Sequence, residues 1–212
     1  MSAEFPRRPK TAKGAIIALR PDSRIFIDPD TPALIFQYNP EMIAHTFSSP
    51  KDDEELSQKE GRSDAGLVSE LMSLILEFDV TDQLENADQN RDVVENGLHP
   101  ALAVLESIMY SQYKTGNPSP PILVFLFGRN RTVPVWLDSL KVVEEAFDPG
   151  LNPIRVSVEL VMRVRALSEF KKGSMGYAIC AGHLNLRRKL GKLYPQNGIM
   201  GGLVDQVNRS IH

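Results

Sequence analysis

Apolar and polar residues alternate along much of the chain, as is typical of β-strands. The longest example covers residues 154–166, and successive side chains of a strand point to opposite faces. The apolar set expected in the core is Ile154, Val156, Val158, Leu160, Met162, Val164 and Ala166. The set expected on the opposite face is Arg155, Ser157, Glu159, Arg163 and Arg165. We therefore predict one long strand that is buried on one face only.

The same alternation, or a short apolar run, predicts further strands at residues 15–19, 24–27, 34–38, 43–47, 74–80, 122–127 and 133–143. Turn residues separate them. Asn39 and Pro40 indicate a corner between two strands, and residues 128–131 indicate a hairpin connection that begins with Gly128. Residues 147–153 indicate another tight connection. Pro134 favours an edge position or a bulge for its strand.

Two segments have helical spacing. Residues 97–113 carry an apolar stripe at three- and four-residue intervals, with Pro100 in the expected first turn. The stripe consists of Leu98, Ala101, Leu102, Leu105, Ile108, Met109 and Gln112. A second helix is expected near residues 177–193. Residues 81–95 are acidic and predicted to be irregular.

These patterns predict an α+β chain that is mainly β. Residues 1–170 are expected to form a β domain with the helix at 97–113 packed against it. Residues 171–212 are expected to form a C-terminal helical extension with a glycine-containing tail. Residues 48–65 are densely charged, with Leu56 among their few apolar side chains, and so long a loop is either functional or disordered.

Composition excludes several classes of protein. The 212 residues are 42% apolar and 24% charged, which is ordinary for a globular domain. The net charge of −3 argues against a chain-wide nucleic-acid footprint. No apolar run approaches the length of a membrane span, and residues 1–13 have no apolar signal core, so we expect synthesis in the cytoplasm without membrane insertion.

Candidate chemistry is sparse. Cys180 is the single cysteine, and with His183 it forms a lone pair that is more typical of helix packing than of a zinc site. The segment from Asp88 through Asn90 to Asp92 begins like a calcium loop. It fails because Val93 and His99 stand where glycine and glutamate are needed.

The remaining chemical candidates are weaker still. The carboxylate pairs Glu144/Glu145 and Asp79/Asp82 have no apolar surroundings that would separate their pKa values. The basic stretch 187–192 fits a solvated helix face or a patch that meets an acidic neighbour better than it fits nucleic acid. We therefore predict no catalytic, cofactor-binding or metal-binding residues.

Six sequence blocks, in order, together resemble the tube-protein domain of contractile injection systems. The closest similarity is to the tube-initiator, or spike-adaptor, baseplate protein of extracellular phage-tail-like particles. The blocks are residues 38–43, 76–82, 120–122, 127–129, 144–149 and 151–156. Family members often carry a C-terminal LysM module, and residues 172–212 show no such pattern. The resemblance is therefore to a shortened adaptor.

This resemblance implies an antiparallel β-sandwich or part-barrel of the phage tail-tube and Hcp type, with a flanking helix. It implies a homo-hexameric ring in the baseplate that connects the spike to the tube and nucleates tube assembly. Partners would be the spike protein, the tube protein and other baseplate subunits, in a particle that is either released or membrane-anchored. Catalysis is not implied.

Other functions stay open on the sequence alone. The chain could be a main tube or tube-end protein of the same machinery. A small-ligand-binding β-barrel would require a large internal apolar pocket. An enzyme would require a convergent polar cluster, and with 4 His and 1 Cys the sequence indicates none.

We expect residues 48–65 and 172–212 to be assembly elements. Deleting residues 48–65 should leave a folded chain, with an unchanged far-UV circular dichroism spectrum, that no longer assembles into tubes. The physical reason is that this charged segment adds little to a core. Electron microscopy checks assembly, and normal tubes from the deletion variant would contradict the assignment.

Overall fold

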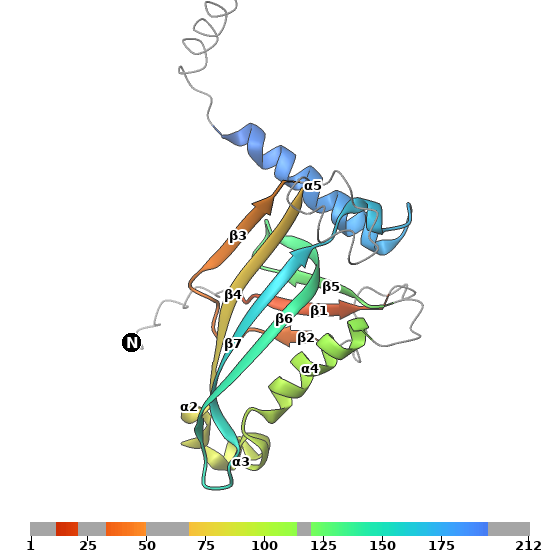
Figure 1. Cartoon of the computed structure of the whole chain (residues 1–212). Helices are drawn as coiled ribbons and strands as arrows, with labels where there is room; N and C mark the ends of the chain where they lie inside the picture. The colour runs from red at the N-terminus through yellow and green to blue at the C-terminus, as the bar shows by residue number, and fades with distance from the viewer. Residues whose placement is uncertain (1–11, 21–32, 50–67, 114–119, 195–212) are drawn as a thin grey trace, which may run out of the picture.

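One antiparallel sheet of seven strands dominates the computed structural model, which describes residues 12–20, 33–49, 68–113 and 120–194 (Figure 1). The strands are β1 (Ala15–Leu19), β2 (Ala33–Ile35), β3 (Ile43–Ser48), β4 (Ser69–Asp79), β5 (Ile122–Leu126), β6 (Thr132–Phe147) and β7 (Pro153–Val164). Their order across the sheet is β2-β1-β5-β6-β7-β4-β3. The prediction of a mainly β chain with helices is confirmed.

The helical elements lie between and after the strands. They are α2 (Thr81–Leu84), the 3-10 turn η1 (Ala87–Gln89), α3 (Arg91–Asn96), α4 (His99–Tyr113), the 3-10 turn η2 (Leu167–Glu169) and α5 (Met175–Leu193). The two long helices, α4 and α5, correspond to the two that the sequence predicts.

The sheet curls back on itself. Strands β2 and β4 are separated by four other strands, so a flat sheet would hold them about 24 Å apart. Gln37 nevertheless lies only two residues beyond β2, and its Oε1 accepts a 2.9 Å hydrogen bond from the backbone amide of Asp79 at the end of β4. The same side chain donates back to the Asp79 carbonyl. The β2 edge of the sheet therefore lies close to the end of β4, next to the opposite edge strand β3.

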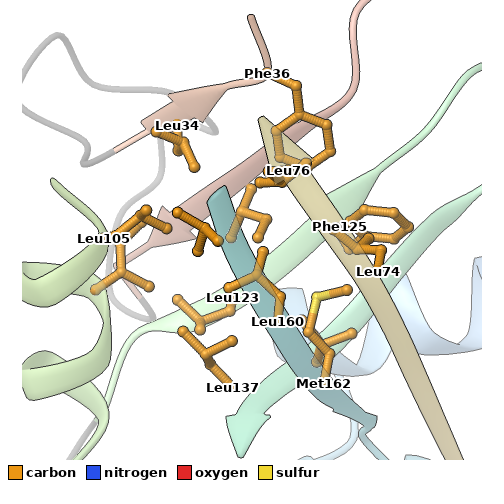
Figure 2. Close-up of a cluster of buried hydrophobic side chains, with 14 of the residues drawn as sticks. Leu34, Phe36, Leu74, Leu76, Leu105, Leu123, Phe125, Leu137, Leu160 and Met162 are labelled. Atoms are coloured by element: carbon orange, nitrogen blue, oxygen red, sulfur yellow. The ribbon is translucent and has the colours of Figure 1, made fainter. Parts of the chain in front are cut away.

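The concave face of the curled sheet forms the main core, and α4 closes it. Leu74 and Leu76 of β4, Leu160 and Met162 of β7 and Phe125 of β5 are at most 3% exposed. Figure 2 shows Leu105 of α4 directed at these strands, beside Leu34 and Leu123. Burying this face removes a large apolar surface from water, and this burial is the main stabilising term of the fold.

The start of α4 is set by a close backbone contact. Gly97 has a φ of 54°, and a side chain there would come within 2.5 Å of the Pro153 carbonyl oxygen. The amide of Leu98 then donates a 2.8 Å hydrogen bond to that oxygen. The helix consequently begins at His99, two residues later than the predicted start.

A smaller apolar cluster lies on the other face of the sheet, where α5 covers β1 and β5. Leu19, Ile122 and Val124 pack there. The side chains that cover them are Phe170, Met175 and Ile179. The first half of α5 is therefore attached to the β body.

Four of the sequence predictions differ from the structure or lie outside the described residues. Residues 81–95 form the short helices α2 and α3 and the turn η1, which bury no residue and so leave no periodic signal. The strand predicted at 34–38 ends at Ile35. The strand predicted at 24–27 lies outside the described residues.

The fourth prediction gave the strand of Pro134 an edge position or a bulge, and the edge position is wrong. Its strand β6 is central, and the register shifts of β6 begin later, between Leu137 and Ser139. Proline is tolerated because β7 ends at Val164, opposite Val135. The Pro134 carbonyl still accepts a 2.9 Å hydrogen bond from the amide of Arg165. Proline has no backbone N–H, so the one ladder hydrogen bond that is lost here is the one that residue 134 would donate toward Arg165.

Neighbouring residues of β4 give a matched test of this one-sided burial. Leu76→Ala should lower the free energy of unfolding by about 2–5 kcal/mol, because Leu76 is 1% exposed and its truncation leaves a cavity. Ile75→Ala, at a site that is 52% exposed, should cost about 1 kcal/mol or less. Urea denaturation measures both, and equal losses would contradict the assigned faces.

Candidate functional site: the outer face of the long strands

The outer face of β4, β7 and β6 carries cross-strand rows in which polar side chains outnumber apolar ones. Glu159 of β7 pairs with Ile75 on one side and Lys141 on the other. The next row joins Glu77, Ser157 and Val143. All of these except the half-buried Ser157 are exposed. This outer face is therefore exposed to solvent, whereas the concave face is buried.

Ion pairs hold both ends of this outer face. Arg155 Nε and Nη2 each lie 2.9 Å from Asp79 Oδ2. Hydrogen bonds from the Thr81 hydroxyl and amide, together with Arg155, lower the pKa of the Asp79 carboxyl. At the other end, Arg163 makes a two-pronged contact with Asp138 at 3.0 and 3.1 Å. Two-pronged Arg–carboxylate pairs have defined geometry, so these side chains are fixed in place.

The prediction that Arg165 faces outward with Arg155 and Arg163 is wrong. Arg165 is 8% exposed, and its guanidinium carbon lies 4.2 Å from the ring centres of both Trp136 and Phe170. Its Nε is 3.1 Å from Glu169 Oε2, which also accepts a 2.8 Å hydrogen bond from Trp136 Nε1. The strand ends at Val164, so the alternation of faces no longer applies one residue later.

A groove runs along the β4 margin of the outer face. The β2–β3 connection forms one wall with Tyr38 and Met42, and Ser73, Ile75 and Glu77 of β4 form the floor. Its volume is about 950 Å³. Glu41, Glu159 and Lys13 also line it. Sequence reasoning missed this groove because its walls come from segments that the curl of the sheet brings together.

Cys180 and His183 lie on the buried side of α5. The Cys180 thiol donates to the Arg165 carbonyl oxygen at 3.5 Å, and burial raises its pKa. Burial, followed by the charge of Arg187, lowers the pKa of His183. Both side chains pack between helix and sheet, as the lone-pair interpretation predicts.

Other sequence candidates stay apart from one another. Asp88, Asn90 and Asp92 lie in the surface stretch of η1 and α3. Among the described residues, no group of three or more His, Cys, Asp or Glu side chains could hold a metal ion. No helix in this part of the chain is long and apolar enough to cross a bilayer.

Comparison with known proteins gives no assignment, since no protein-family model matches the chain and no curated protein matches it. The geometry of the outer face and the sequence blocks described above are therefore the features that bear on function.

The buried imidazole of His183 predicts a pH-dependent stability. Its unfolded form takes up a proton near the ordinary pKa of 6.5, whereas the folded form does so only at lower pH. The unfolded state therefore binds more protons below pH 6.5, and the free energy of unfolding should fall as the pH drops from 7.5 to 5.5.

A His183→Gln variant removes this titrating group. Urea denaturation at several pH values should show a smaller loss of stability for the variant than for the wild type over this interval. An identical pH dependence for the two proteins would contradict the burial effect.

Proposed function

We propose that this chain is a structural, non-catalytic component of a contractile injection system. It forms a hexameric inner-tube ring in the baseplate, connects the spike to the tube and nucleates tube assembly. The curled sheet with α4 packed against it supports this proposal, because a tail-tube or Hcp-type domain would have a part-barrel with a flanking helix.

The observation that carries this proposal is the difference between the two faces of the long strands. The concave face is packed against α4, whereas the outer face presents Glu77, Lys141 and Glu159 to solvent. A ring protein of this kind would use a sheet with two different faces. A buried apolar face would hold the subunit together, and a solvent-exposed polar face would line an aqueous channel. Arg155 and Arg163, the other side chains predicted to face outward, lie on the same outer face.

Charge pairing on the outer face fits passage of other molecules through a channel. Arg155 and Arg163 are each paired with an aspartate, and Lys141 lies 3.9 Å from Glu159. Paired charges keep a surface hydrated without a strong net field that would retain a charged payload.

Within the described residues, no strand pairs with the outer side of β2 or of β3, so the sheet ends in two edges. Unpaired strand edges are a hazard for aggregation in a monomer, and pairing between neighbouring subunits removes it. A contact between two different surfaces of identical subunits can close into a ring. Both features support an assembled rather than a solitary role.

A main tube or tube-end protein of the same machinery would share these features. The number of copies per particle distinguishes the two, because an adaptor occupies one ring and a main tube protein occupies many. A ligand-binding barrel is less well supported, because Leu76, Phe125, Leu160 and their neighbours fill the concave side (Figure 2).

Native mass spectrometry of the purified full-length chain tests the proposal. We expect a species of six copies of the 23.6-kDa chain that increases with protein concentration, because each subunit offers two strand edges. Negative-stain images of this species should show rings with a central hole. A chain that stays monomeric at high concentration, or that forms only closed dimers, would contradict the proposal.

A further inference from the structure

The groove defined above combines apolar side chains with three carboxylates, those of Glu41, Glu77 and Glu159, against the single basic side chain of Lys13 among its described lining residues. Exposed apolar side chains line it, with Met42 72%, Ile75 52% and Tyr38 50% exposed. Glu41 and Glu77 are exposed at its rim, and neither has an ion pair with another described residue. Apolar side chains in a concave surface with unpaired carboxylates around them are typical of a contact site for an amphipathic, basic partner.

The C-terminal half of α5 has the complementary chemistry. Its exposed apolar side chains are Leu190, Leu193 and Tyr194, the last two 75% and 77% exposed. Lys189 and Lys192 stand among them and make no ion pair within the described part of the chain. This end of α5 therefore presents apolar and basic groups together.

The two surfaces lie at opposite ends of β3. Arg187 of α5 contacts Glu70, which pairs with Phe47 near the end of β3, whereas Met42 of the groove precedes the start of β3. Six strand residues span about 20 Å. Figure 1 shows α5 across one end of β3 and β4, with the β2–β3 connection at the other end of β3. The helix end therefore does not cover the groove of its own subunit.

We propose that the C-terminal half of α5 docks into the β4-margin groove of a second copy of this chain. Leu193 and Tyr194 would cover Met42 and Ile75, while Lys189 and Lys192 would face Glu41 and Glu77. The contact joins two different surfaces, so it repeats head to tail and closes into a ring or extends as a filament. It rests on the proposed ring function and adds a helix contact to the pairing of strand edges between subunits. The neighbour's helix then covers the outer face of β4, while Lys141, Val143 and Arg155 stay open to a channel.

Charge reversal on the full-length chain tests this contact by sedimentation velocity. The groove variant Glu41→Lys/Glu77→Lys and the helix variant Lys189→Glu/Lys192→Glu should each weaken self-association by about tenfold or more, because each places like charges together. A chain with all four changes restores opposite charges and should recover association. The control Glu95→Lys/Glu106→Lys changes exposed residues of α3 and α4 and alters the net charge by the same amount as the groove variant. It should leave association unchanged.

The outcomes separate this inference from the proposed function. Six-copy rings that are insensitive to both reversals, or that the four-change chain fails to rescue, would overturn the contact while leaving the ring proposal intact. A charge-dependent and rescuable contact that builds dimers or filaments would support the docking and contradict the six-fold ring. If the groove instead holds the chain's own residues 1–11, with Arg7, Arg8 and Lys10, then helix reversal has no effect and the inference fails.

Discussion

Burial of one face of the sheet against α4 is the constraint on which the rest of the structure depends. Long strands with apolar side chains on alternate positions can bury only one face without a second layer on the other. Leu102, Leu105 and Ile108 of α4 cover the concave face and, together with the curl of the sheet, exclude water from it. The outer face is then free to be polar.

A cluster of side chains around Arg165 fixes α5 relative to the sheet. The buried guanidinium of Arg165 lies between the rings of Trp136 and Phe170 and is paired with Glu169. Burying a charge costs free energy unless the charge is paired and hydrogen-bonded, and Arg165 meets both conditions. Gly176 allows the ring of Phe170 to approach α5 closely, since a side chain there would overlap it. The direction in which α5 leaves the body is thereby set by contacts close to the end of β7.

The sequence predicts the local structure well because its periods are strong. Alternation over residues 154–166 identifies β7, and the stripe from Leu98 to Gln112 identifies α4. Gln112 even completes the stripe as a polar member, because its Oε1 accepts a 2.9 Å hydrogen bond from the Leu137 amide. Arg165 departs from the predicted alternation because a periodic pattern does not show where a strand ends.

Strand order and the groove could not be predicted in this way. Residues 34–47 read as two strands joined at a corner, yet β2 and β3 lie at opposite edges of the sheet. The contact of Gln37 with Asp79, 42 residues apart, shows that the β2 edge approaches the end of β4. Such non-local contacts depend on how the whole sheet curls, and neither periodicity nor turn residues encode them.

In the proposed assembly, identical subunits surround an axis with the outer face of β7 and β6 turned toward it. Electron cryo-microscopy of the assembled full-length protein would show this arrangement. We expect a hollow ring in which Arg155, Glu159 and Arg163 face the central channel and α4 lies on the outside. A reconstruction with α4 facing the axis, or with these three side chains on the outer rim, would contradict it.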